Sequence, residues 1–161
     1  MPKIIVLTGL PGSGKSTYLK QRGIASVSSD QLRELLSGDA TDQGIHKGVF
    51  AAVRYLVRQR LRLGQAVTYV DATHLTPWER KPYIEIAGKY GCAVESLYFD
   101  VPLEECKRRN QGRDRVVPDD VLDRMAKKLV KPSKSEGFSS VRIAPKGHGD
   151  EGPRGGGNKR K

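Results

Sequence analysis

Short apolar stretches alternate with amphipathic stretches along most of this 161-residue chain. The apolar, partly β-branched runs are typical of buried parallel strands, and stretches with apolar residues every three or four positions predict helices. Strands are expected at residues 3–8, 24–28, 66–71 and 92–101, with 137–143 as a candidate fifth strand at the sheet edge. Helices are expected at residues 15–22, 31–36, 44–63, 77–91, 102–109 and 118–129. This alternation predicts an α/β fold with a four- to five-stranded parallel sheet and helices on both faces.

The longest predicted helix, residues 44–63, has the clearest periodicity. Its core-facing residues are expected to be Ile45, Val49, Val53 and Leu56. Gly64 follows where a helix end favours a residue in the left-handed region. In the next helix, Thr76 is expected as the N-cap, Pro77 at the first helical position and Gly91 at the end.

A glycine-rich segment joins the first predicted strand to the first predicted helix. Residues 9–17 read Gly-Leu-Pro-Gly-Ser-Gly-Lys-Ser-Thr and fit the spacing G-x-x-x-x-G-K-[ST] of the phosphate-binding loop. Glycines permit a backbone turn that directs successive N–H groups at a polyphosphate. Lys15 is expected to reach the β- and γ-phosphates of ATP or another nucleoside triphosphate, and Ser16 to ligand Mg²⁺. The predicted nucleotide-binding residues of the loop are Gly9, Gly12, Ser13, Gly14, Lys15, Ser16 and Thr17. The order strand, loop, helix favours this interpretation over a glycine-rich surface turn.

Length and composition place limits on the protein class. The length fits one domain with a proper core, and no apolar run approaches the roughly 20 residues of a membrane span. The N-terminus lacks a signal-peptide pattern. Cys92 and Cys106 lie outside any Cys-x-x-Cys or His-rich spacing, so reduced thiols in a cytoplasmic protein are expected.

The net charge of +11 bears on possible partners. Residues 131–161 hold eight Lys and Arg against three Asp and Glu, so six of the net positive charges lie in residues 1–130. A polyanionic partner beyond ATP is therefore plausible, with a generic solubilising surface as the alternative. We expect residues 1–144 to form the domain and residues 145–161 to be a disordered, basic, Gly-rich tail. That tail is interpreted either as an electrostatic arm for nucleic acid or as a cloning remnant.

Two aspartates at predicted strand ends are candidate catalytic residues. Asp30 follows the second strand, and Arg33 lies one helical turn later on the same face. The carboxylate could accept the proton of an attacking hydroxyl and Arg33 could hold a substrate phosphate; the alternative is a helix-capping aspartate with a solvated arginine. Asp71 ends the third strand and resembles the acidic element that handles Mg²⁺ directly or through water. His74, three residues on, is more typical of a loop residue than of a catalyst. Because parallel strands end at one edge, Asp30, Asp71 and the phosphate loop are expected to share one crevice.

The segment 107–115 reads Lys-Arg-Arg-Asn-Gln-Gly-Arg-Asp-Arg and is expected to lie beside the same crevice. Phosphoryl transfer needs mobile cations that close over the γ-phosphate, and arginine suits this because its fork binds phosphate oxygens in pairs. The segment therefore predicts an arginine-bearing lid, with a solvated basic loop as the alternative. The features together favour a kinase over a switch GTPase, whose N-K-x-D pattern is not present.

Residues 3–129 resemble the kinase domain of the bacteriophage T4-type 5′-hydroxyl polynucleotide kinases, within the P-loop kinases. The resemblance rests on the phosphate loop, Asp30 with Arg33, Asp71 with Thr73, then Pro77, Glu79 and Arg80, residues 99–102, Arg109-Asn110 with Arg113, and residues 117–122. It implies transfer of the ATP γ-phosphate to the 5′-OH of DNA or RNA, as in nucleic-acid repair. Asp30 would be the general base and Arg33 would contact a substrate phosphate. Arg113 would be the lid arginine on ATP, with Arg109 beside it, and Asp71 would belong to the active site.

The first prediction is therefore a Mg²⁺- and ATP-dependent polynucleotide 5′-hydroxyl kinase, a phosphotransferase of the EC 2.7.1 type that acts on 5′-OH ends of DNA or RNA. The second is a small-molecule kinase of the same superfamily with a sugar, antibiotic or nucleoside acceptor. The third is a nucleic-acid-binding ATPase without transferase activity, in which Asp30→Ala would leave ATP turnover intact. Basic charge outside the tail favours the first, since a neutral acceptor would not need it.

Overall fold

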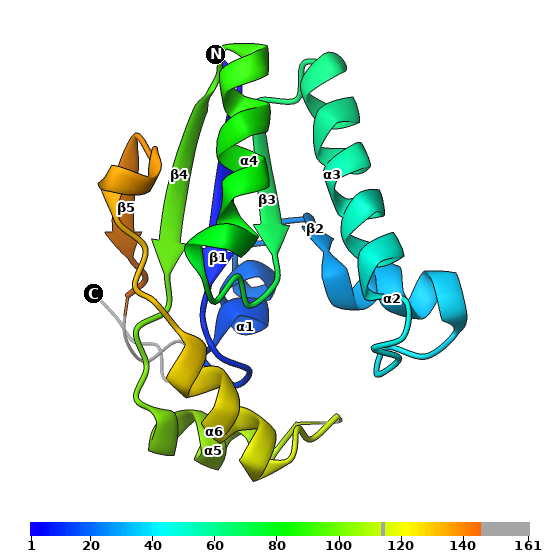
Figure 1. Ribbon diagram of the computed structural model, residues 1–161, viewed down its shortest axis with the longest axis vertical. Helices are drawn as coiled ribbons and strands as arrows, with labels where there is room; N and C mark the ends of the chain where they lie inside the picture. Colours follow the sequence, from blue (N-terminus) through cyan, green and yellow to red (C-terminus); the bar gives the residue numbers. More distant parts are fainter. Residues whose placement is uncertain (114, 146–161) are drawn as a thin grey trace, which may run out of the picture.

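A parallel sheet of five strands forms the centre of the molecule, in the order β2-β3-β1-β4-β5 (Figure 1). The computed structural model describes residues 1–113 and 115–145. The strands are β1 (Lys3–Thr8), β2 (Ser26–Ser28), β3 (Val67–Asp71), β4 (Ala93–Tyr98) and β5 (Ser140–Ile143). The candidate fifth strand is confirmed as β5, which pairs in parallel with β4 at the edge of the sheet.

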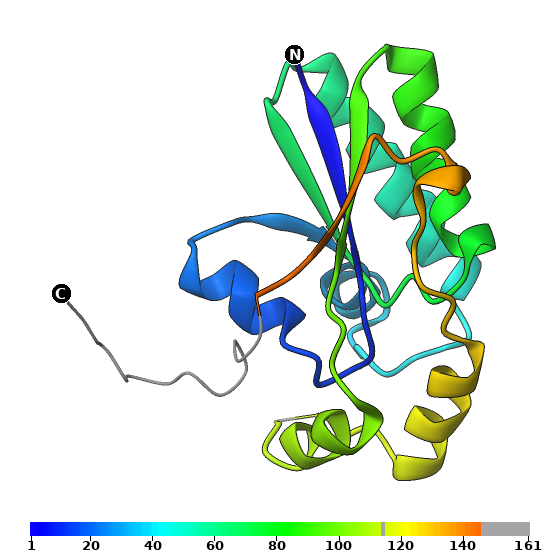
Figure 2. The ribbon, with the colours of Figure 1, turned by 90° about the vertical axis from the view of Figure 1, so that its left-hand side faces the viewer.

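Helices cover both faces of this sheet, as predicted. The helices are α1 (Lys15–Gln21), α2 (Ser29–Ser37), α3 (His46–Arg62), α4 (Pro77–Tyr90), α5 (Leu103–Asn110) and α6 (Asp119–Lys128), with a short 3₁₀ turn η1 (Lys134–Glu136) before β5. Figure 1 shows α3 and α4 in front of the sheet, and Figure 2 shows α1 on the opposite side. The pair α5 and α6 lies below the strand ends and carries the segment that was predicted to be a lid (Figure 2).

The apolar run of β1 is buried on both sides because alternate residues face different layers. Ile4 and Val6 belong to the core shared with α3 and α4, whereas Ile5 and Leu7 pack with Tyr18 and other residues on the α1 side. A strand buried on both faces reads as a continuous apolar run, which is why β1 showed no polar alternation. The loop that follows β1 is thereby held at the centre of the sheet.

One residue in the predicted buried face of α3 was assigned wrongly. The helix buries Val49, Val53, Val57 and Leu61, while Leu56 is 37% exposed. A straight helix keeps residues four apart on nearly the same line, so Val57 rather than Leu56 continues the stripe from Val53. The predicted helix ends are confirmed: Thr76 Oγ1 accepts from the Glu79 amide at 3.3 Å, and Gly64 and Gly91 have φ of 79° and 64°.

The C-terminal segment is anchored as far as it is described. Ala144 is buried, and its amide donates to the carbonyl of Tyr98 at 2.8 Å. The tail predicted from residue 145 onward lies outside the described residues except for Pro145. No helix in the described ranges combines the length and apolarity that crossing a membrane requires.

Candidate active site

The glycine-rich segment forms a tight loop between β1 and α1. Gly12 and Gly14 have φ of 85° and 99°, in the left-handed region that favours glycine. A Cβ at Gly12 would lie 2.5 Å from the carbonyl oxygen of Cys106, so α5 rests directly on the loop backbone. Both observations require glycine at this position. The left-handed backbone at Gly12 and Gly14 also allows successive N–H groups to turn inward, as a polyphosphate cradle needs.

Lys15 lies over this loop at the first position of α1. Its Nζ donates to the carbonyl of Gly9 at 2.8 Å and to that of Leu10 at 3.0 Å. Burial lowers the pKa of Lys15, and the negative charge of Asp71 opposes that shift. A desolvated ammonium with only carbonyl partners is suited to an anionic ligand at the same place.

Asp71 stands at the end of β3, beside the end of β2. The register pairs Ser28 of β2 with Asp71 of β3, which brings the residues after β2 next to this carboxylate. Burial raises the pKa of Asp71, while the positive charge of Lys15 lowers it. The expected meeting of the phosphate loop and Asp71 at one edge of the sheet is therefore present.

Asp30 lies in the first turn of α2, which begins immediately after β2. The N-cap of this helix is Ser28, whose Oγ accepts from the Gln31 amide at 3.3 Å. The alternative in which Asp30 caps the helix is therefore wrong. Its carboxylate is 53% exposed and accepts from Nη2 of Arg115 at 2.6 Å. Lys15 and Asp71 both lie within electrostatic reach of Asp30.

Arg33 is placed differently from the solvated arginine of the alternative interpretation. Its side chain lies one turn after Asp30 but is only 4% exposed. Nη1 donates to the carbonyl of Asp42 at 3.0 Å and braces the connector between α2 and α3. Nε is buried and has no hydrogen-bond partner in the described part of the chain. The guanidinium thus retains a donor for a further ligand.

The loop between α5 and α6 is closed at its base by Asn110. This side chain is fully buried; Nδ2 donates to the carbonyl of Val117 at 2.6 Å, and Oδ1 accepts from the Val117 amide at 3.0 Å. The sequence argument placed Asn110 in the lid but did not predict the latch, because no local pattern identifies a partner seven residues away. The latch holds the arginines of the loop next to the crevice.

The arginines of this loop differ in their surroundings. Burial lowers the pKa of Arg113, and neighbouring Arg115 lowers it further, while Asp30 and Asp71 oppose both effects. Nη1 of Arg113 is buried and has no partner among residues 1–113 and 115–145. Arg109 donates from Nε to Glu105 at 2.9 Å within α5, and its expected place beside the nucleotide stays a prediction. The pair of Arg115 with Asp30 was not predicted, although Arg115 belonged to the segment singled out.

His74 is a buried part of the loop after β3. Its Nδ1 lies 2.6 Å from the carbonyl oxygen of Leu7, and its ring meets that of Tyr83 edge-on with centroids 5.2 Å apart. Burial lowers the pKa of His74 to about 4, so the ring is neutral and Nδ1 carries the hydrogen that it donates. Its φ of 46° fits the loop interpretation. Nearby Arg80 donates from Nη1 to the carbonyl of His74 at 2.8 Å.

These residues fit a magnesium-bound nucleoside triphosphate. The loop glycines supply the cradle, Lys15 and Arg113 supply cations, and Ser13 Oγ is a buried hydroxyl with no partner in the described ranges. Ser16 is exposed in the first turn of α1. The described residues contain no group of three or more His, Cys, Asp or Glu able to hold a metal by themselves. Mg²⁺ commonly binds through few protein ligands together with substrate phosphates, which matches Ser16 with Asp71 nearby.

Two curated relatives carry names of kinases. The L-seryl-tRNA(Sec) kinase of Methanococcus maripaludis is 27% identical over 138 residues, which cover 80% of this chain and 53% of the relative. The bifunctional polynucleotide phosphatase/kinase of Schizosaccharomyces pombe is 22% identical over 148 residues, which cover 89% of this chain and 33% of the relative. The chain therefore spans about half, or less, of the length of these relatives.

Solved structures show the same fold. A chain of the Pnkp1/Rnl/Hen1 complex has a TM-score of 0.58 and 26% identity, with 73% of this chain and 40% of that chain covered. A gluconokinase from Sinorhizobium meliloti 1021 has a TM-score of 0.59 and 20% identity, with 88% and 81% covered. The fold is that of the P-loop kinases. A family model described as an AAA domain matches residues 4–132, and the chain belongs to this family, AAA_33.

Proposed function

We propose that the chain is an ATP- and Mg²⁺-dependent polynucleotide kinase that transfers the γ-phosphate of ATP to a 5′-hydroxyl end. The observation that carries the proposal is the place of Asp30: an exposed carboxylate, one strand away from Asp71, within electrostatic reach of Lys15 and Arg113. A general base must be reachable by the acceptor and near the transferred group, and Asp30 meets both conditions. Two relatives named for tRNA and polynucleotide kinases, and the basic charge outside the tail, support a nucleic-acid acceptor.

Each charged or polar residue of the site has a distinct role in the proposed phosphoryl transfer. The acceptor oxygen forms a bond to the γ-phosphorus while the bond to the bridging oxygen of ADP breaks, and the hydroxyl proton passes to Asp30. Lys15 and Arg113 neutralise charge on the transferred group, as lysine and arginine do in related chemistry. Mg²⁺ would supply further neutralisation of the phosphate oxygens, with Ser16 as its ligand. Arg115 donates to Oδ2 of Asp30 at 2.6 Å, so Oδ1 of the exposed carboxylate would take the hydroxyl proton.

Arg33 would serve the acceptor rather than ATP. Its buried guanidinium keeps Nε without a partner in the described residues, and the adjoining Asp30 would face the hydroxyl. A phosphate on the 3′ side of the acceptor nucleoside would then meet a fixed cation. The charge-assisted hydrogen bond would place the 5′-OH against the base.

The direct test uses ATP labelled in the γ-phosphate with 5′-OH oligonucleotides of DNA and RNA and a panel of sugars, nucleosides and other alcohols. Asp30→Asn should bind ATP normally and lower transfer to 5′-OH ends by roughly 10²-fold or more. Asp120→Asn makes the same change on the exposed lid helix and should have no effect. Labelling of a small alcohol alone would support the small-molecule kinase, and ATP hydrolysis without labelling would support the ATPase. Wild-type transfer by Asp30→Asn would remove Asp30 from the mechanism.

A further inference from the structure

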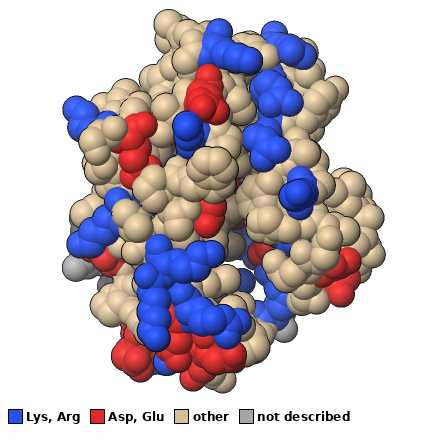
Figure 3. Space-filling model, in the orientation of Figure 1, with Lys and Arg blue, Asp and Glu red and all other residues tan. Residues whose placement is uncertain are grey.

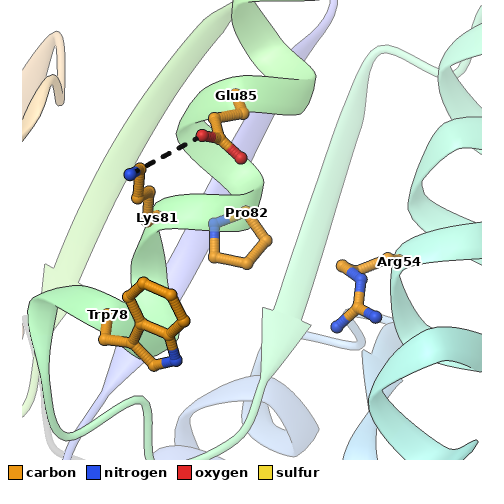
Figure 4. Close-up of a pocket in the computed structure, with 5 residues that line it drawn as sticks. All are labelled: Arg54, Trp78, Lys81, Pro82 and Glu85. Atoms are coloured by element: carbon orange, nitrogen blue, oxygen red, sulfur yellow. Dashed lines mark ion pairs between the residues drawn. The ribbon is translucent and has the colours of Figure 1, made fainter. Parts of the chain in front are cut away.

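Trp78, the single tryptophan of the chain, stands out from the surface in the first turn of α4. Its side chain is 79% exposed, although indole is usually found largely buried. The ring separates two open hollows. The hollow toward α3 is lined by Arg54, Lys81, Pro82 and Glu85 as well as Trp78 (Figure 4). The other is lined by Pro77, Lys81, Ile84 and Glu136 together with Trp78. Lys81 Nζ lies over the indole, 6.0 Å from the ring centroid, and the exposed ring can stack on a ligand with its other face.

The hollow toward α3 is flanked by cations. Figure 4 shows Arg54 reaching from α3 toward α4, and Lys81 on α4 above the indole, with its ammonium on the side away from Arg54. Burial raises the pKa of Tyr83 on α4, and the positive charge of Arg54 opposes that rise, so the guanidinium lies close to α4. The one carboxylate that lines this hollow, Glu85, lies 3.9 Å from Lys81. We call this hollow, with Trp78 at its edge, the α3–α4 groove.

The helix on one side of the α3–α4 groove is basic throughout. α3 contains five Lys and Arg and no Asp or Glu. Arg60 donates to Thr68 and to the carbonyl of Val67, whereas Arg54 and Arg58 form no ion pair with any described carboxylate. Blue side chains follow this face of the molecule in Figure 3. Uncompensated cations along a helix attract a polyanion.

The α3–α4 groove leads to the catalytic edge of the sheet. Figure 1 shows β3 between the two helices, with its carboxyl end at their lower ends. β3 ends at Asp71, and Asp30 follows the neighbouring strand β2. A polymer that lies in the groove therefore extends toward the residues proposed to receive its 5′ end.

We propose that the α3–α4 groove binds single-stranded nucleic acid, with a base stacked on Trp78 and phosphates held by Arg54 and Lys81. The inference rests on the proposed function and adds a second contact region on the same substrate. Stacking on an aromatic side chain requires a base that is free of a duplex, which selects single strands. Single-stranded DNA and RNA both present bases beside phosphodiesters, so the binding experiment tests the two nucleic acids separately.

The sole tryptophan makes binding directly observable. The protein is titrated, without ATP, with single-stranded DNA or RNA 12-mers that already carry a 5′-phosphate and so cannot act as acceptors. We expect saturable quenching of the Trp78 emission by at least one of them. With dye-labelled 12-mers, Trp78→Ala should raise the Kd by at least about fivefold, and Trp78→Phe by less, since phenylalanine retains an aromatic face.

Charge variants test the phosphate contacts. Arg54→Gln should reduce the slope of log K against log salt by about 0.7, the value for one phosphate contact on a single strand. Lys20→Gln removes the same charge from α1 on the opposite face and should change the slope less. Equal slopes for the two variants, or unchanged emission with both nucleic acids, would overturn the proposal. So would concentration-dependent dimerisation that Trp78→Ala abolishes, because the occupant would then be a second copy.

Kinase assays separate this inference from the proposed function. In Trp78→Ala the KM for a 5′-OH 12-mer should rise several-fold, while the KM for a nucleoside 3′-monophosphate should stay at the wild-type value. If wild type phosphorylates 5′ ends and Trp78→Ala does so with unchanged KM, the groove is not used and the proposed function stands. If Trp78→Ala weakens binding but wild type labels no 5′ end, the groove stands and the proposed function fails.

Discussion

Among the side chains of the lid loop, Arg113 is half-buried between Asp30, Asp71 and Arg115, with Nη1 lacking a partner in the described residues. A charged donor held in this way is prepared for phosphate oxygens. We expect Arg113→Ala to lower turnover by roughly 10³-fold or more, as loss of transition-state arginines does in related chemistry. Arg113→Lys should recover only part, because lysine lacks the bidentate fork.

Steady-state kinetics with ATP and the accepted hydroxyl compound check this expectation. Arg108→Ala provides the control, since Arg108 is exposed and paired with Glu105 on α5. Normal turnover in Arg113→Ala would contradict this expectation and would assign the phosphate-binding role to Arg115 or Arg109.

His74 gives the fold a defined dependence on pH. Burial lowers its pKa from 6.5 to about 4. As the pH falls below 6.5, the unfolded chain binds a proton at this residue and the folded chain does not, so the stability due to neutral His74 is lost between pH 6.5 and 4. The slope should approach about 1.4 kcal/mol per pH unit below pH 6, which gives a loss of about 1.6 kcal/mol between pH 6.5 and 5.

Urea unfolding at pH 6.5 and pH 5 measures this loss. His74→Asn retains a donor for the Leu7 carbonyl but does not titrate. The variant should be less stable at pH 6.5 and show a smaller decrease on acidification. Equal decreases in the two proteins would show that His74 is not the titrating group.

At the scale of elements, a buried ion pair joins α4 to the segment before β5. Arg80 is fully buried, and its Nε and Nη2 each donate to Glu136 at 2.8 Å. Glu136→Ala would leave the guanidinium buried without its carboxylate. We expect a loss of about 3–5 kcal/mol in the free energy of unfolding, the cost of breaking a buried pair.

Denaturant unfolding tests this expectation against an exposed pair on the same helix. Glu85→Ala breaks the contact with Lys81; the two side chains are 65% exposed (Glu85) and 60% exposed (Lys81). The free energy of unfolding should therefore fall by at most about 1 kcal/mol. A similar loss in both variants would contradict the anchoring role of Arg80 and Glu136.

The region around this anchor shows both what local sequence patterns can predict and what they cannot. Thr76, Pro77 and Gly91 marked the ends of α4 correctly, because caps act on neighbouring residues. The glycine-rich loop and Asp71 were placed correctly because strand ends of a parallel sheet share one edge. The pairing of Arg80 with Glu136, 56 residues apart, has no local signature. The same holds for Arg115 with Asp30, which are 85 residues apart.

Burial of charged side chains was equally hard to anticipate. Nothing in the sequence predicted that Arg33 and Arg80 are buried, since arginine is rarely fully buried unless it is paired. Each is buried because a distant carbonyl or carboxylate receives its guanidinium: Asp42 for Arg33, and His74 with Glu136 for Arg80. The core stripe of α3, by contrast, needed only helical geometry, and Leu56 was misassigned by one position.

At the scale of the whole molecule, the charge of +11 sets the response to salt. Residues 146–161 hold five Lys and Arg and two Asp and Glu, and they lie outside the described residues. Ala144 is the last buried residue in the described ranges, and its amide bonds to the carbonyl of Tyr98. Truncation after Ala144 is therefore expected to leave the thermal unfolding temperature and ATP binding unchanged.

The same truncation should weaken binding to single-stranded nucleic acid and flatten its salt dependence. Each cation that contacts a phosphate adds about 0.7 to the slope of log K against log salt, so loss of several contacts is readily measured. Binding of a labelled 12-mer is compared for the full chain and the truncated chain at several salt concentrations, with turnover on a nucleoside 3′-monophosphate as the control. An unchanged slope would mean that the tail contributes nothing to binding, and the basic surface of residues 1–144 would then carry the whole electrostatic attraction.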